Sequence, residues 1–149
     1  MELALWLHDV VYDPHQKNNE LESALYAAYQ LKKLGLPAHC VQQVRDLILV
    51  TQHPSNPLRY DEKVLVDIDL SILGADAEIF MQYEKNIRQE YCWVDDIVYC
   101  KERAKILQDF LVQKQLYQTD YFFEQKEQLA RCNLENLIII LREQISIIQ

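Results

Sequence analysis

The sequence has very few of the residues that make tight turns. It contains two glycines and four prolines among 149 residues. A sheet of many strands needs such residues at its turns, so their scarcity predicts an all-α fold. The length matches one domain with a single hydrophobic core. We therefore expect residues 1–149 to form one helical bundle of six to seven helices.

Basic residues and long apolar runs are also scarce. The 15 Lys and Arg residues are outnumbered by 23 Asp and Glu residues, which leaves a net charge of -8. Binding of nucleic acid depends on clustered Lys and Arg, so the composition argues against a nucleic-acid polymer as a partner. The apolar run 137–141 is far shorter than the ~20 residues needed to cross a bilayer. No membrane partner is expected.

The four cysteines do not form close pairs. They stand singly at Cys40, Cys92, Cys100 and Cys132, without the spacing of a zinc or redox site. Met1 is followed directly by an acidic residue, which is not typical of a secretory signal. We expect four reduced, mostly buried thiols in a soluble, cytoplasmic protein.

Apolar spacing and capping residues predict where the helices lie. The expected helices cover residues 3–11, 18–33, 37 to about 52, 64–73, 76–91, 95 or 96 to 112, and a long last one from 119. Residues 64–73 also alternate apolar and acidic side chains at the two-residue period of a strand. A helix is the better prediction, because no other segment offers a partner strand for its backbone hydrogen bonds.

The pair His8 and Asp9 lies inside the most apolar predicted helix, residues 3–11, which we expect to be buried. Most of the residues three and four positions away from each of them are apolar. A carboxylate in such surroundings is costly unless a cation or several donors compensate it. A dipeptide is nevertheless a weak motif, and a core histidine beside an arginine-paired or capping aspartate would look the same.

A second acid strengthens the case for a bound cation. If residues 64–73 are helical, the near neighbours of Asp69 are all apolar, whereas Asp67 has Lys63 and Ser71 nearby. We therefore expect Asp69 to be buried and Asp67 to be partly solvated. One imidazole and two carboxylates, from His8, Asp9 and Asp69, suit a divalent ion such as Mn, Fe, Zn, Ni or Mg.

The chain resembles the HD superfamily of metal-dependent phosphohydrolases, and more closely an uncharacterised bacterial branch of it. The matching phrases are 3–13 around His8-Asp9, Asn19-Glu20 with Ser23-Ala24, 67–74, 87–91, Arg103 with Leu107 and 110–111, and 130–134. The resemblance implies a helical bundle that hydrolyses small phosphate esters or nucleotides. It also implies His8, Asp9 and Asp69 as metal ligands, with Asp67 as a possible substitute. Asp9 would also act in catalysis, by orienting the attacking water or bridging a second ion.

One ligand of that pattern is absent from this chain. The superfamily places a further histidine on a helix before the His-Asp pair, and none of residues 1–7 is a histidine. Two explanations stay open: the natural start lies upstream, or this version gave up tight metal binding, so that the metal is absent or weakly bound. Among the other histidines, His15, His39 and His53, we expect His53 to be the best substitute. Alternatively, His53 contacts the phosphate.

Three further residues are candidates for contact with the substrate. Glu20 lies at the start of a predicted helix, and Arg88 and Arg103 could clamp a phosphate group. Each could equally have a structural role, as a helix-dipole partner or in an ion pair.

The alternative to a phosphohydrolase is a non-catalytic binding or interaction domain of the same fold with an incomplete metal site, for instance a homodimer.

Overall fold

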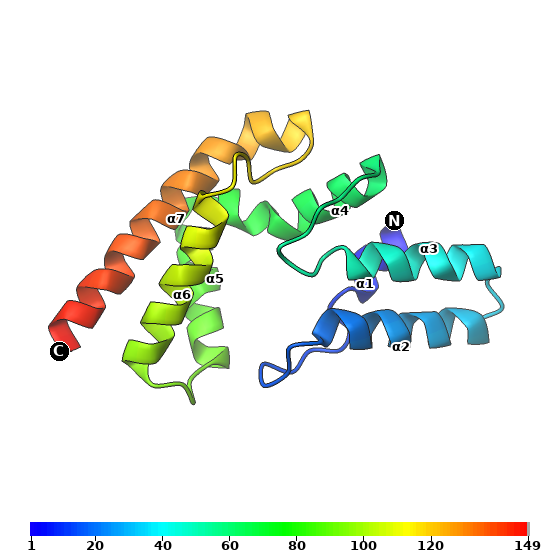
Figure 1. The fold of residues 1–149 in the computed structure, drawn as a ribbon, viewed down its shortest axis with the longest axis horizontal. Coiled ribbons are helices and arrows are strands. Elements are labelled where there is room, and N and C mark those ends of the chain that lie inside the picture. The colour runs from blue at the N-terminus through cyan, green and yellow to red at the C-terminus, as the bar shows by residue number, and fades with distance from the viewer. Residues whose placement is uncertain (149) are drawn as a thin grey trace. The chain divides into compact units, whose positions relative to one another are not determined.

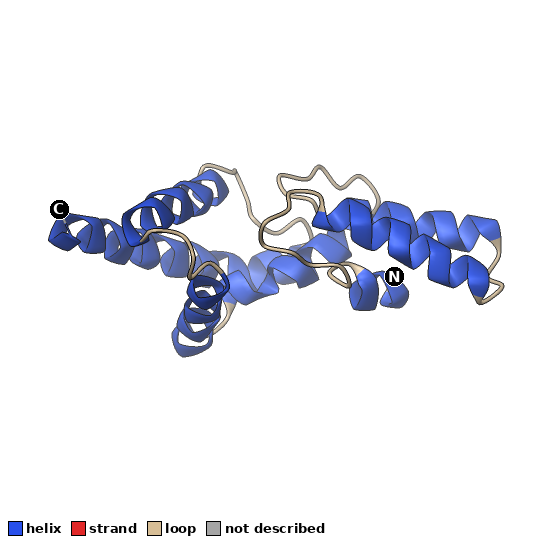
Figure 2. Cartoon of the chain, turned by 90° about the horizontal axis from the view of Figure 1, so that it is seen from below, coloured by secondary structure: helices blue, strands red, loops and turns tan. Residues whose placement is uncertain are grey.

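The computed structural model describes residues 1–148. Within this range the chain forms seven α-helices and one short 3-10 helix, with no β-strand (Figure 2). The elements are α1 (Glu2–Leu7), α2 (Asn19–Lys33), α3 (Ala38–Leu49), α4 (Tyr60–Asp69), η1 (Leu70–Gly74), α5 (Ala77–Glu90), α6 (Asp96–Leu111) and α7 (Asp120–Ile148). The predicted all-α fold of six to seven helices is confirmed. None of the helices in this range is both long and apolar enough to span a membrane.

The chain divides into two compact units, and each is described by itself. The first unit is Met1–Asp69, with helices α1 to α4, and the second begins at Leu70 and contains η1 and helices α5 to α7. The single-domain organisation stays a prediction.

Helices α2 and α3 form the body of the first unit and lie side by side (Figures 1 and 2). The turn between them contains Gly35, whose φ of 79° is in the left-handed region that favours glycine just after a helix. Apolar side chains from all four helices of the unit form its core. The buried set is Ala4, Ala24, Ala27, Leu31, Val41, Val44, Leu47, Ile48 and Leu65.

In the second unit, α7 packs along α6 and holds the short helix η1. The side-chain amide of Asn133 donates to the carbonyls of Leu73 and Ala75, both at 2.9 Å. Lys126 Nζ donates to the carbonyl of Gly74 at 3.1 Å. These bonds satisfy carbonyls at the end of η1 that have no partner within the helix itself.

The helix predicted for residues 3–11 is wrong in extent and in burial. Helix α1 ends at Leu7, its only buried residue is Ala4, and Trp6 is 78% exposed. The reason lies in α2, where the hydroxyl of Ser23 accepts from the N–H of Val11 and donates to its carbonyl, both at 3.1 Å. Backbone groups that a longer helix would have used for its own bonds are thus bound to another element.

The other predicted helices are present. Residues 64–73, predicted to be helical despite their strand-like alternation, lie in α4 and η1. Helices α5 to α7 begin within about a residue of their predicted starts. The Asp95 side chain caps α6, since it accepts from the N–H groups of Ile97 and Val98. All four cysteines are free thiols, but only Cys100 is buried, and Cys92 and Cys132 are exposed, so the expectation of mostly buried thiols is wrong.

Candidate metal centre

His8 is placed by the end of α1 so that one ring nitrogen is committed to the backbone. Its Nδ1 lies 2.9 Å from the carbonyl oxygen of Leu5. A carbonyl can only accept, so Nδ1 carries the hydrogen and Nε2 faces the acids. This arrangement, with the far ring nitrogen held by a backbone carbonyl, is common among histidines that bind metal through the other nitrogen.

Two carboxylates approach the Nε2 atom of His8. The Oδ2 atom of Asp9 lies at 3.3 Å and the Oδ1 atom of Asp69 at 3.4 Å. Asp69 is the last residue of α4, so residues 61 positions apart in the chain, 8 and 69, meet in one unit. The structure therefore brings His8, Asp9 and Asp69 together, as the sequence predicted.

His53 joins the same group of side chains. It lies in the loop between α3 and α4, and its Nε2 atom is 3.2 Å from Oδ2 of Asp69. We call His8, Asp9, His53 and Asp69 the HHDD cluster. All four belong to the first unit.

The charges of the cluster stabilise one another. Asp69 and then Asp9 raise the pKa of His8 from 6.5 to about 10, despite the opposing effect of burial. Burial alone would raise the pKa of Asp69, but the hydrogen bonds from His53 and His8 outweigh it and lower this pKa from 3.8 to about 2. Without a metal ion, the imidazolium of His8 balances the carboxylate of Asp69.

Two predictions about burial in this region are wrong. Asp67 is 0% exposed and the side chain of Asp69 is 24% exposed, the reverse of what we expected. The expectation counted residues 72 and 73 as helical neighbours of Asp69, but α4 ends at Asp69. Asp9 is also mostly exposed, at 62%, because the apolar helix that was expected to enclose it ends two residues earlier.

The candidate substrate residues in the second unit are engaged in structural contacts. Arg103 forms a two-pronged pair with the buried Glu84, with its Nε atom 2.9 Å from Oε2. Burial alone would lower the pKa of Arg103, but Glu84 raises it. Arg88 donates to the carbonyls of Tyr91 and Val94 at 2.6 and 3.0 Å. Both guanidinium groups thus serve the packing of their own unit.

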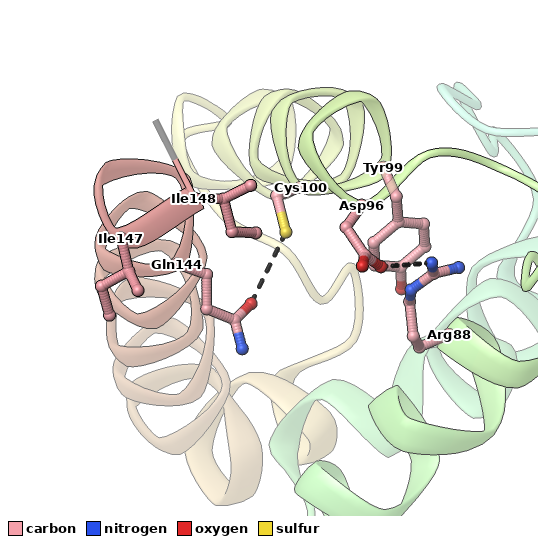
Figure 3. Close-up of a pocket in the computed structure, with 7 residues that line it drawn as sticks. All are labelled: Arg88, Asp96, Tyr99, Cys100, Gln144, Ile147 and Ile148. Carbon is pink, nitrogen blue, oxygen red and sulfur yellow. Dashed lines mark hydrogen bonds and ion pairs between the residues drawn. The ribbon is translucent and has the colours of Figure 1, made fainter.

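Arg88 also lines a cavity of about 340 Å³ in the second unit (Figure 3). There it pairs with Asp96 and lies 4.7 Å from the ring centre of Tyr99, while Cys100 Sγ donates to Gln144. The charged groups that line this cavity are therefore paired with each other.

Glu20 lies half-buried in the first turn of α2. Within residues 1–148, no hydrogen bond or ion pair joins it to the HHDD cluster. Its contact with a substrate stays a prediction.

Two residues that position the site were not recognised from the sequence as doing so. Asn19 accepts from the N–H of Asp13 and donates to its carbonyl, both at 3.0 Å, while Ser23 holds Val11 in the same way. They stand four positions apart, on one face of α2. The sequence signal that could have identified them is the spacing of four residues from Asn19 to Ser23 and on to the buried Ala27. This spacing places two small polar side chains on one helix face that packs against another segment.

A divalent ion is chemically compatible with these side chains. Two imidazole nitrogens and two carboxylates are donors that Mn, Fe and Zn accept. In the part of the chain that the structure describes, however, no three His, Cys, Asp or Glu side chains are already arranged to hold a metal ion. The four members of the cluster are linked in pairs, so binding requires their side chains to readjust around an ion.

Comparisons with known proteins add no family or relative. No family model matches the chain, and no curated protein or solved structure matches it either.

Proposed function

We propose that this protein is a metal-dependent phosphohydrolase that acts on a small phosphate ester or nucleotide. The observation that carries the proposal is the meeting of His8, Asp9 and Asp69, with both carboxylates within 3.4 Å of the same imidazole nitrogen. The resemblance to the HD superfamily names the same three residues. This agreement supports the proposal.

Each residue has a chemical role in this proposal. A divalent ion bound here would lower the pKa of water and offset charge on a phosphoryl group. His8, with Nδ1 held by the carbonyl of Leu5, would offer Nε2 to the ion. Asp69 supplies a half-buried carboxylate. Asp9 is the more exposed acid, in a position to orient water at the solvent side.

The test combines metal binding with a phosphatase screen on the full chain. Purified protein is titrated with Mn²⁺, Co²⁺, Ni²⁺ and Zn²⁺ and assayed with p-nitrophenyl phosphate, its diester and a set of nucleotides. We expect one bound metal ion per chain and metal-dependent hydrolysis. Both should be lost in Asp69→Asn and His8→Ala. Asp61→Asn, which changes an acid at the other end of α4, should retain them.

The outcomes separate this proposal from the alternative of a non-catalytic domain. Metal binding that depends on Asp69, without hydrolysis of any phosphate ester, would favour a binding domain with the same site. Failure of every ion to bind at saturating concentration would contradict the metal site itself.

A further inference from the structure

Three aromatic side chains gather in the second unit, where the chain passes from α5 to α6. Tyr91 follows the last residue of α5, Trp93 lies in the turn and Tyr99 belongs to α6. The ring centres of Tyr91 and Trp93 lie 6.1 Å apart, and those of Tyr91 and Tyr99 lie 6.5 Å apart. These separations are within the range of direct aromatic contact. We call Tyr91, Trp93 and Tyr99 the aromatic cluster.

The aromatic cluster lines a cavity of about 260 Å³. The remaining residues of its wall are Ile87, Val94, Glu102, Arg103 and Ile106. This cavity is not the one in Figure 3: Tyr99 contributes to both, whereas Arg88 and Asp96 line only the cavity in the figure. Pockets for drug-sized ligands usually measure about 300 to 1,000 Å³, so this cavity suits a smaller ligand.

The turn that carries Trp93 is held in place by several hydrogen bonds. The N–H of Val94 donates to the carbonyl of Tyr91 at 2.9 Å, and the guanidinium of Arg88 donates to the carbonyls of both residues. The side chain of Asp95 then caps α6. The turn is thus ordered before a ligand binds, which lowers the entropy cost of binding.

The two charged residues of the cavity wall differ in their partners. The guanidinium of Arg103 is paired with the buried carboxylate of Glu84. Glu102 is exposed, and within residues 1–148 its side chain forms no hydrogen bond or ion pair. The wall therefore offers aromatic rings together with one carboxylate that has no counter-charge.

These features favour a cation as the ligand. A cation is attracted to the face of a Trp or Tyr ring when it lies within about 6 Å of the ring centre. The spacing of the aromatic cluster allows one cation to lie within this distance of two rings at once. A neutral ligand would remove water from the carboxylate of Glu102 without replacing it, whereas a cation compensates that charge.

We propose that this cavity binds a small organic cation with a methylated ammonium group, such as trimethylammonium. The methyl groups spread the charge over an apolar surface, which suits a wall of aromatic and aliphatic side chains. Trp93 is 55% exposed, so much of its ring is accessible to the ligand, and Glu102 balances the positive charge. The cavity belongs to the second unit, so the proposal does not depend on the metal site in the first.

The test compares choline with the neutral alcohol of the same shape, in which a carbon atom replaces the nitrogen. Calorimetric titration of the full chain at constant ionic strength measures both affinities in wild type, Trp93→Leu and Glu102→Gln. Asp109→Asn is the matched control, because it removes another exposed acid of α6 and changes the net charge by the same amount. Circular dichroism verifies that each variant is folded.

Tryptophan fluorescence provides a second measurement. The chain has two tryptophans, Trp6 and Trp93, and Trp6 lies in α1 of the first unit. In Trp6→Phe the tryptophan emission comes from Trp93 alone. Choline should change this emission saturably, with the affinity that calorimetry gives.

We expect one choline to bind per chain, at least about fivefold more tightly than the neutral alcohol. Trp93→Leu should weaken choline binding at least about fivefold. Glu102→Gln should reduce the preference for choline over the alcohol, and Asp109→Asn should behave as wild type does.

Three results would overturn the proposal. Absence of saturable choline binding would show that the cavity is not a site for this class of ligand. Equal affinities for choline and the alcohol would show that the cavity selects shape and not charge. If Asp109→Asn weakens choline binding as much as Glu102→Gln does, the attraction comes from the net charge of the protein and not from this cavity.

Discussion

The side chain of Ser23 binds both backbone polar groups of Val11, at 3.1 Å each. Ser23 is completely buried, and Val11 follows the His8-Asp9 pair by two residues. The hydroxyl thus replaces the helical bonds that would otherwise have carried α1 onward. It connects the fold of α2 to the placement of the candidate site.

Replacing Ser23 should therefore affect stability and site together. In Ser23→Ala the N–H and carbonyl of Val11 lose their common partner, which should cost about 1 to 3 kcal/mol of unfolding free energy. Urea denaturation measures this change, and metal titration should show weaker binding because His8 is less firmly placed. Ser146→Ala, which removes an exposed hydroxyl in α7, should change stability by less than about 0.5 kcal/mol. Equal effects of the two substitutions would contradict the positioning role.

The pair of His8 and Asp69 predicts a pH dependence for the protein kept metal-free with a chelator. The pKa of His8 is raised from 6.5 to about 10, so its contribution is complete below pH 6.5 and is lost as pH rises through 10. The pKa of Asp69 is lowered from 3.8 to about 2, so its contribution is complete above pH 3.8 and is lost as pH falls through 2. Both shifts describe one contact, which is strongest between these limits.

The measurement is the difference in unfolding free energy between wild type and Asp69→Asn across pH. We expect this difference to be largest between pH 3.8 and 6.5 and to shrink steadily towards pH 10. Asp9→Asn should give a smaller difference, because the Asp9 carboxylate is mostly exposed and solvent screens its attraction to His8. A difference for Asp69→Asn that stays constant from pH 5 to 10 would show that His8 is not charged by this contact.

Local patterns predicted most of the fold but not the details of the site. Helices α2 to α7 could be located because their apolar spacing and flanking residues, such as Asp95 before α6, act within the segment itself. The end of α1 could not, because it depends on a hydroxyl twelve residues away on α2. The burial of Asp67 and Asp69 likewise depends on where α4 ends and on which other elements cover it. The meeting of His8 with Asp69 was expected, whereas the contact of His53 with Asp69 needed the fold of the α3–α4 loop.

Gly74 should be required for the stability of the folded protein, because there is no space for a side chain at this position. A Cβ atom at this position would lie 2.7 Å from Cβ of Lys126 and 2.9 Å from both the Lys126 carbonyl oxygen and the Tyr117 hydroxyl. Backbone cannot move away cheaply, so Gly74→Ala should destabilise the protein by about 1 to 3 kcal/mol, measured by urea denaturation.

Gly35 provides the comparison, because an added Cβ there meets nothing within 4 Å. Gly35→Ala should lower the unfolding free energy only because alanine disfavours the left-handed backbone, by about 1 to 2 kcal/mol. Gly35→Asn should lower it less, because asparagine adopts this conformation more readily. Gly74→Asn should be no more stable than Gly74→Ala, because the restriction at position 74 is the lack of space for a Cβ atom. If asparagine were tolerated better than alanine at position 74 as well, the close approach to α7 would not explain the glycine.

Arg103 should affect stability rather than catalysis. Its side chain is 14% exposed and that of its partner Glu84 is 5% exposed, so Arg103→Ala leaves a buried carboxylate without its counter-charge. Loss of one partner of such a pair costs about 3 to 5 kcal/mol, whereas replacing both by apolar residues costs far less. We therefore expect Arg103→Ala to lower the thermal midpoint strongly and the double variant Glu84→Leu with Arg103→Leu to recover most of the loss. Arg59→Ala, at an exposed pair, should cost at most about 1 kcal/mol.

In the folded double variant, metal affinity and KM for any hydrolysed phosphate ester should equal those of wild type. An increase in KM that persists after stability is restored would return Arg103 to the substrate site.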